Sequence, residues 1–204
     1  MENYENKTEL AYKKIKKMIH DETLTSYQPI SENRLANDLQ MSRTPIRSAL
    51  KLLEKEGFIK VVPKYGVFLK DLSDEEANHL YDIRKALERF VIRQIINTIS
   101  TEDIQKLKKM IDVQKEAYER KDPNGFMSSD QDFHEYFFRI YDNPKMLELV
   151  KQLQDRFLLI GLRACKYENR MGPSIQEHTQ LLEALEKKNL EEALNQVTRN
   201  IKLR

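Results

Sequence analysis

The sequence predicts a mainly α-helical protein of two domains, in which three helices and a β-hairpin are followed by an all-helical bundle. Three observations support this prediction. Apolar residues recur at helical spacing along most of the 204-residue chain. The pattern typical of strands is confined to residues 58–70. The chain has only 5 glycines and 6 prolines, so few positions would interrupt helices.

The first three helices are expected from periodicity and from residues that start or stop helices. Apolar residues among lysines predict an amphipathic helix over residues 7–24. Ser31 is a candidate N-cap for a short helix that runs through Leu39, and Ser42 is a candidate N-cap for the next helix. Gly57 supplies a C-terminal stop for that third helix.

Residues 58–62 and 67–70 are expected to form a β-hairpin around a Pro-Lys-Tyr-Gly turn. Three helices and this hairpin make a winged helix-turn-helix, which we place at residues 1–72. Helical periodicity alone continues from there, so residues 73–204 are expected to form an all-helical bundle. Its expected helices are 74–99, 102–121, 124–141, 144–168, 174–187 and 190–204.

Positive charge is concentrated in the third helix and the wing. Residues 43–70 carry seven Lys/Arg against two Glu, a local net charge of +5 in a chain whose total is +2. A helix-turn-helix inserts the N-terminal end of its second helix into the major groove, where Arg can bind guanine. The candidate contacts there are Arg43, Thr44 and Arg47. Lys64 and Tyr65, at the wing tip, could reach a phosphate or the minor groove. A solvated cationic surface would give the same pattern of charge.

Other protein classes are disfavoured by composition. No apolar run approaches the roughly 18 residues of a membrane helix, and the N-terminus lacks the apolar stretch of a signal peptide, so a cytoplasmic protein with no membrane partner is expected. The single cysteine, Cys165, excludes an internal disulfide and is expected to be a buried helical residue.

Polar residues interrupt apolar faces in the predicted bundle. Asp130 and His134 are four residues apart, so they share one face of a helix, and His178 lies among apolar residues of another helix. Buried polar groups need partners. Such residues are compatible with an ordinary hydrogen-bonded core and with ligation of a divalent cation. His20 and His79 are expected at the surface.

Residues 8–70 resemble the DNA-binding segment of the GntR family of bacterial regulators. The resemblance rests on the Ser-Arg-Thr-Pro-x-Arg core, the Ala-Leu-x-x-Leu-x-x-Glu-Gly run and the glycine of the wing. It implies a winged helix-turn-helix that binds double-stranded operator DNA. The residues implied in DNA contact are Arg43, Thr44, Arg47, Tyr65 and Gly66.

Residues 73–204 resemble the FCD ligand-binding domain of one GntR subfamily, through the segments IRKALE, DQDFHEYFFRIYDNPKML and QEHTQLLEAL. Six helices rather than seven are typical of its VanR-like subgroup. Metal-binding members use one aspartate and three histidines, and Asp130, His134 and His178 match the first three. The fourth position, 22 residues beyond His178, is Asn200. The resemblance therefore implies one divalent ion, Zn, Ni or Mn, with Asn200 or water completing its shell; an amide oxygen favours harder ions than imidazole does.

Together these features predict a homodimeric transcription regulator whose operator affinity depends on a small-molecule effector, expected to be a carboxylate. Arg84 could bind such a carboxylate with two hydrogen bonds, and Asn200 could also contact it. A salt bridge from Arg84 to Glu88, one turn on, is the alternative for that residue. A helical-bundle metalloenzyme fused to a DNA-binding domain is the alternative function, but the repeated Glu-x-x-His pairs of such enzymes are missing.

Overall fold

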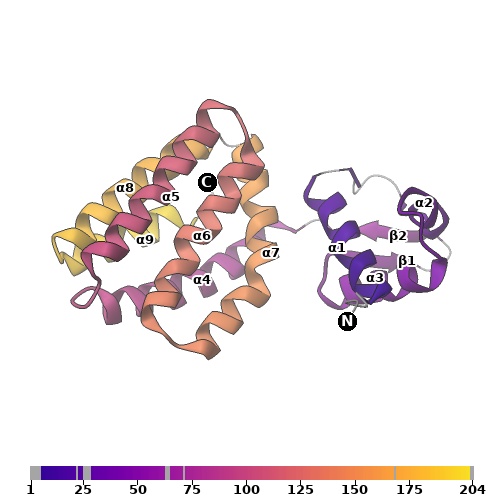
Figure 1. Cartoon of the computed structure of the whole chain (residues 1–204), viewed down its shortest axis with the longest axis horizontal. Coiled ribbons are helices and arrows are strands. Elements are labelled where there is room, and N and C mark those ends of the chain that lie inside the picture. Colours follow the sequence, from indigo (N-terminus) through magenta and orange to yellow (C-terminus); the bar gives the residue numbers. More distant parts are fainter. Residues whose placement is uncertain are drawn as a thin grey trace, which may run out of the picture. The chain divides into compact units, whose positions relative to one another are not determined.

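The computed structural model describes residues 6–21, 23–24, 29–62, 65–70, 72–167 and 169–202. The chain divides into two compact units, Met1–Asp71 and Leu72–Arg204. Both are drawn in Figure 1, and the mainly helical fold class is confirmed. The elements are α1 (Lys7–His20), α2 (Glu32–Asp38), α3 (Arg43–Lys55), β1 (Ile59–Val62), β2 (Gly66–Leu69), α4 (Asp74–Ile95), α5 (Thr101–Glu119), α6 (Pro123–Tyr141), α7 (Pro144–Tyr167), α8 (Met171–Glu186) and α9 (Leu190–Asn200).

The first unit is the expected winged helix-turn-helix. Its strands β1 and β2 pair antiparallel, with Ile59 opposite Leu69 and Val62 opposite Gly66. Helices α1, α2 and α3 bury one apolar face each. Gly57 follows α3 with φ +79°, a left-handed conformation that favours glycine and ends the helix as predicted. The best-buried large side chains of this unit are Ile15, Leu35, Ile46, Leu53 and Ile59.

Local details at the helix ends differ from the sequence-based expectations. Helix α1 ends at His20 rather than at residue 24, and α4 ends at Ile95 rather than at residue 99. Helix α8 begins at Met171, so Pro173 lies in its first turn instead of before it. The first turn tolerates proline because its N–H groups have no intrahelical acceptor. Ser42 is the N-cap residue of α3, but its side chain makes no capping hydrogen bond.

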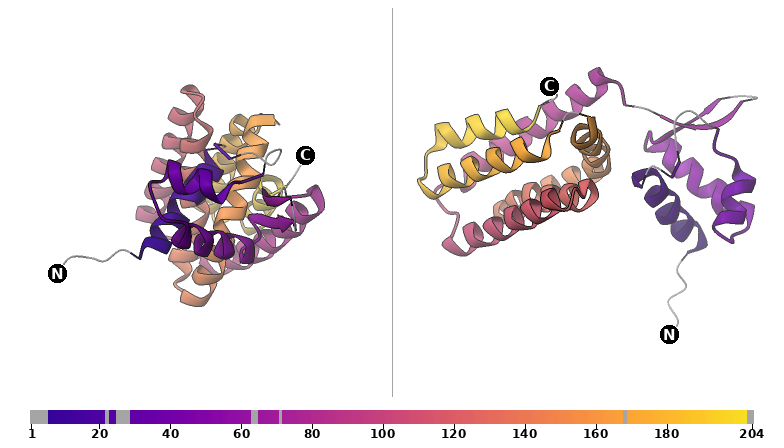
Figure 2. Two further views of the ribbon diagram at one scale, coloured as in Figure 1. Left: turned by 90° about the vertical axis from the view of Figure 1, so that its right-hand side faces the viewer. Right: turned by 90° about the horizontal axis from the view of Figure 1, so that it is seen from above.

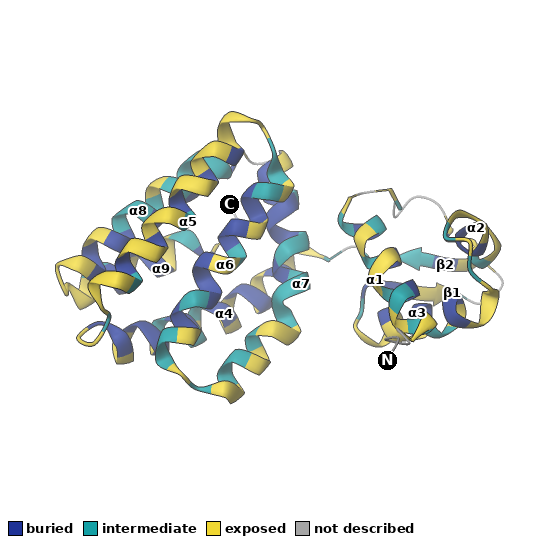
Figure 3. Ribbon diagram, viewed as in Figure 1, coloured by how far each residue is buried: buried dark blue, intermediate teal, exposed yellow. Residues whose placement is uncertain are grey.

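The second unit is a bundle of α4 to α9. Helix α6 packs against α4, α5 and α7, and α8 packs against α5 and α9. The pair α8 and α9 is seen side by side in Figure 2. Buried residues line the inward faces of these helices in Figure 3. The largest fully buried side chains of α6 include Phe133 and Phe137. No helix in the described part of the chain combines the length and the apolar character that crossing a membrane requires.

Candidate functional site

The predicted DNA contacts of α3 lie on its exposed surface. Arg43, Thr44 and Arg47 are all exposed in the first two turns of this helix. Arg47 already has a partner, because its Nη2 lies 2.9 Å from Oε2 of Glu32 on α2. A hydrogen bond to Glu32 raises the pKa of Arg47, which is a cation in any case. Arg43 and Thr44 are exposed to solvent, whereas Arg47 would have to leave the carboxylate of Glu32 before it could contact DNA.

The wing carries the remaining DNA candidates. The side chain of Tyr65 is 74% exposed. Gly66 has φ +111°, and an added Cβ would lie 3.3 Å from Cβ of Pro29, so both conformation and space favour glycine there. Lys64, the other predicted residue of the wing tip, lies outside the described residues.

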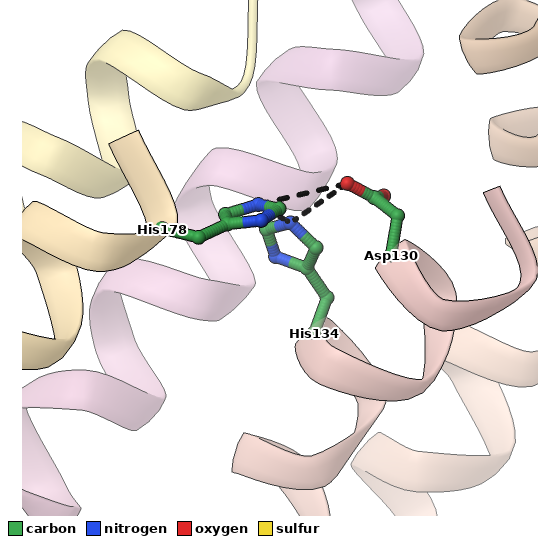
Figure 4. A group of neighbouring side chains, drawn as sticks. All are labelled: Asp130, His134 and His178. Atoms are coloured by element: carbon green, nitrogen blue, oxygen red, sulfur yellow. Dashed lines mark hydrogen bonds and ion pairs between the residues drawn. The ribbon is translucent and has the colours of Figure 1, made fainter. Parts of the chain in front are cut away.

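Asp130, His134 and His178 come together in the core of the second unit. Figure 4 shows Asp130 and His134 on α6 facing His178 on α8. The two Nε2 atoms are 3.1 Å apart. Oδ1 of Asp130 lies 3.6 Å from Nε2 of His178 and 3.9 Å from Nε2 of His134. Ligand atoms of one ion at about 2.0–2.2 Å would be about 3–3.5 Å apart, so three potential ligand atoms are close to the required spacing.

The other ring nitrogen of each histidine has its own polar partner. Nδ1 of His134 lies 2.7 Å from Oε2 of Glu88, and Nδ1 of His178 lies 2.8 Å from Oε1 of Gln114. A carboxylate only accepts hydrogen bonds, so His134 carries its proton on Nδ1. With Oε1 of Gln114 as acceptor, His178 does the same. Both Nε2 lone pairs then face each other, and only a cation or a proton between them would make this arrangement favourable.

Burial and charge set the protonation states around the two histidines. Burial lowers the pKa of His178 to about 3, so this imidazole is neutral at ordinary pH. Burial opposes ionisation of Glu88, but His134 and Arg84 outweigh it and lower the pKa of that carboxyl group. Burial also opposes ionisation of Asp130, but positively charged neighbours that include Arg84 outweigh it and lower the pKa of that carboxyl group. A neutral imidazole beside an anionic carboxylate is the combination that a divalent cation binds.

A second hydrogen-bond arrangement would need no ion. If the amide of Gln114 were reversed, its nitrogen would donate to Nδ1 of His178, whose Nε2–H would donate to His134. In the structure the oxygen of Gln114 faces His178, and its Nε2 has no hydrogen-bond partner among the described residues. With Gln114 in this orientation, Asp130, His134 and His178 fit a bound cation. The orientation of the Gln114 amide distinguishes this arrangement from the one that needs no ion.

A small cavity adjoins this cluster. Its volume is about 30 Å³, and Arg84, Asp130 and Asn200 are among the residues that line it. The predicted salt bridge of Arg84 is present, with Nε 2.7 Å from Oε1 of Glu88. Nη2 of Arg84 lies 3.7 Å from Oδ2 of Asp130. Both residues expected to bind an effector thus lie at one cavity, next to the candidate metal ligands.

The structure also places the residues that were expected to have no role. His79 is exposed, as predicted, whereas His20 is half-buried at the end of α1. Cys165 is buried, as predicted, and burial raises the pKa of its thiol to about 12. The thiol is therefore a neutral, poorly nucleophilic side chain at ordinary pH.

Three functional candidates were missed by the sequence analysis. Glu88 was considered only as a partner of Arg84, although it also orients His134. Gln114 lies 64 residues from His178 in the chain, and no spacing rule connects them. Arg170 lies just before α8, where no helical periodicity predicts which side chains are buried. It is nevertheless only 5% exposed and lines the cavity. Of the three, only Gln114 had a signal in the sequence, because it is a polar residue on the apolar face of α5.

Comparison with known proteins agrees with this architecture. Residues 7–69 match the family model described as bacterial regulatory proteins, gntR family, and residues 79–202 match that of the FCD domain. The HTH-type transcriptional regulator YdhC of Bacillus subtilis is 27% identical over 91% of this chain and 84% of its own length. The gluconate operon transcriptional repressor of Bacillus licheniformis is 29% identical over 84% of this chain and 72% of its own.

Solved structures show the same fold. A transcriptional regulator described as GntR from Rhodococcus sp. RHA1 has a TM-score of 0.79 and 20% identity, covering 95% of this chain and 93% of that one. Escherichia coli McbR/YncC has a TM-score of 0.74 and 19% identity, covering 96% and 93%. YdhC and the gluconate operon repressor are both named as transcriptional regulators. The chain therefore belongs to the gntR family of bacterial regulatory proteins, carries an FCD domain, and is a transcriptional regulator rather than an enzyme.

Proposed function

We propose that this regulator binds an operator as a homodimer and that a small carboxylate, held beside a divalent cation in the FCD domain, controls its DNA affinity. The observation that carries the DNA-binding half of this proposal is the exposed, cationic N-terminal end of α3, with Arg43 and Thr44 facing solvent. Base contacts from this part of a helix-turn-helix give sequence specificity. The name of the gluconate operon repressor, a relative, supports repression as the outcome of binding.

Substitution of Arg43 by alanine should weaken binding to an operator selected from random DNA by about 1–3 kcal/mol. The expected reason is loss of a two-bonded contact to guanine. Arg47→Ala should cost less, because the wild-type side chain must first leave Glu32. Fluorescence anisotropy at physiological salt measures both affinities and the number of chains per operator.

Lys51→Ala is the matched control, because Lys51 is an exposed cation in the C-terminal half of the same helix. It should reduce the affinity for operator and random DNA equally and only slightly. If Lys51→Ala and Arg43→Ala weaken operator binding alike, α3 is merely a cationic surface and the assignment of base contacts is wrong.

The homodimer is supported by an apolar stripe on α4. Ile83 and Phe90 are 44% and 43% exposed, and the half-buried Leu87 lies between them. Residues at positions i, i+4 and i+7 share one face of a helix. Exposed apolar side chains of this size are typical of surfaces that bind another protein surface. Two chains would present two copies of α3 to two half-sites.

The charge of the cavity supports a carboxylate as the effector. Three cations, Arg84, Arg170 and Lys202, line it together with a single carboxylate, Asp130. Arg84 in particular is buried beside the candidate cation, and guanidinium groups bind carboxylates with two parallel hydrogen bonds. Gluconate, after which the operon of one relative is named, is itself a carboxylate. A bound divalent ion would add positive charge and open coordination positions for the same anion.

The size of the cavity suggests how binding could alter the protein. A volume of about 30 Å³ holds roughly two water molecules, so a carboxylate of several atoms must displace the cavity walls. Helix α7 forms one wall through Phe157, Gly161 and Ala164. From the same helix Arg163 donates to the carbonyl oxygen of Leu72 at 3.0 Å and to Asp74 at 2.8 Å. Movement of α7 would therefore pull on the segment where the second unit begins.

A further inference from the structure

The side-chain amide of Asn200 is held in one orientation. Its Nδ2 donates to Oε2 of Glu177 at 3.2 Å and to Oγ of Ser174 at 3.1 Å. Because a carboxylate cannot donate, the group that faces Glu177 must be the NH₂ group of Asn200. The carboxamide oxygen then points away from Glu177. The Asn200 side chain also makes a hydrogen-bond contact with His178, and Asn200 lines the same cavity as Asp130.

Arg170 contacts both Glu177 and the backbone of Asn200. Its two Nη atoms donate to the two carboxylate oxygens of Glu177, at 3.3 and 2.7 Å. Nη2 also donates to the backbone oxygen of Asn200 at 3.2 Å, which satisfies a carbonyl at the end of α9. The side chains of Arg170 and Glu177 are only 6% and 13% exposed. A buried ion pair contributes little net stability, because desolvation offsets its attraction, so a positioning role explains it better.

From these contacts we infer that Arg170, Glu177 and Ser174 fix the orientation of the Asn200 carboxamide, so that its oxygen acts as the fourth protein ligand of the cation site. This oxygen raises the affinity of the site for Mn²⁺ relative to its affinity for Zn²⁺. The inference rests on the proposed metal site of Asp130, His134 and His178. Carbonyl oxygen suits hard cations such as Mn²⁺, whereas imidazole suits Zn²⁺ and Ni²⁺. Arg170, Glu177 and Ser174 are positioning residues, since they act through Asn200.

The test measures Mn²⁺ and Zn²⁺ affinities of the full chain after removal of metal by a chelator. Free Mn²⁺ is followed by electron paramagnetic resonance, and Zn²⁺ by competition with a chromophoric chelator. Asn200→Leu should weaken Mn²⁺ binding at least about tenfold and Zn²⁺ binding less, since two imidazoles remain. Asn200→His should instead raise the Zn²⁺ preference at least about tenfold.

Glu177→Gln tests the locking contacts. A glutamine amide can donate as well as accept, so it no longer forces the Asn200 oxygen toward His178. Binding of Mn²⁺ should weaken about tenfold, and Glu177→Asp should restore part of it. The matched control is Glu183→Gln, because Glu183 is an exposed carboxylate of the same helix. This variant should leave both affinities unchanged. If Glu177→Gln fails to fold, Ser174→Ala provides the same comparison at an uncharged position.

The outcomes separate this inference from the metal site itself. Wild-type protein that binds neither ion overturns both. If the wild type and Asn200→Leu bind Mn²⁺ equally tightly, the metal site stands but Asn200 is not one of its ligands. Glu177→Gln protein that is less stable but has unchanged Mn²⁺ affinity would show that the Arg170–Glu177 pair is only structural, which overturns the positioning role.

Discussion

Substitution of His134 or His178 by alanine should weaken binding of divalent metal more than about 100-fold, because even a residue that only orients a ligand contributes about 10–100-fold. Each imidazole supplies one of the three ligand atoms that converge in the core. In the wild type, a metal present at 1,000 times its Kd should stabilise the folded protein by about 4 kcal/mol. Calorimetric titration and thermal unfolding of chelator-treated protein, with and without metal, measure the two effects.

His79→Ala is the matched control for this experiment, since His79 is an exposed histidine of α4. It should change neither the affinity nor the metal-dependent stabilisation. Gln114→Leu keeps all three ligand atoms and removes only the acceptor for Nδ1 of His178, so an intermediate loss is expected. Wild-type protein that binds no metal and gains no stability from it would identify the cluster as an ordinary polar core with the amide of Gln114 reversed.

Arg84→Met should destabilise the second unit by about 3–5 kcal/mol, because it leaves the carboxylate of Glu88 buried with one cation fewer. Glu88 is only 1% exposed, and Arg84 is 2.7 Å from it. The guanidinium also lies 5.1 Å from the ring centre of Phe157, so the substitution removes a cation–π contact as well. Chemical unfolding at neutral pH, without metal or effector, measures the change.

Two comparisons show whether burial is the cause. Lys106→Met breaks an ion pair of the same 2.7 Å length on the surface of α5, and it should cost less than about 1 kcal/mol. The double variant Arg84→Met with Glu88→Gln should regain much of the lost stability, because it buries a neutral amide in place of a carboxylate. Equal losses for Arg84→Met and Lys106→Met would contradict a buried, energetically coupled pair.

Features that depend on local sequence were predictable. Apolar periodicity and turn residues predicted the three helices, the hairpin and the bundle, since each element must bury one face of its own pattern. Helix ends were less predictable: the Gly172-Pro173 dipeptide was expected to precede α8, but Pro173 fits its first turn. The pair Asp130 and His134 followed from a spacing of four residues, and His178 followed from its place among apolar residues of another helix. The family resemblance added Asn200.

Features that depend on tertiary packing were not predictable. Glu32 lies 15 residues before Arg47, and nothing in the sequence shows that their side chains meet. The same holds for Gln114 and His178, which the fold of α5 onto α8 brings together. Arg170 reaches Glu177 and the end of α9 from a connecting segment, where no period applies. These contacts orient the side chains that spacing had already identified.

Control of DNA binding by the helical domain is tested most directly by the operator affinity of the metal-loaded wild type. It is measured with and without the small carboxylate that raises the melting temperature most in a screen that includes gluconate. The carboxylate should change operator affinity by at least about fivefold, the lower end of typical coupling between two sites. Arg84→Lys, which keeps the charge but loses the planar fork, should bind the carboxylate more weakly and need more of it. An operator affinity that no stabilising carboxylate alters would contradict the claim that the helical domain controls DNA binding through its buried cationic site.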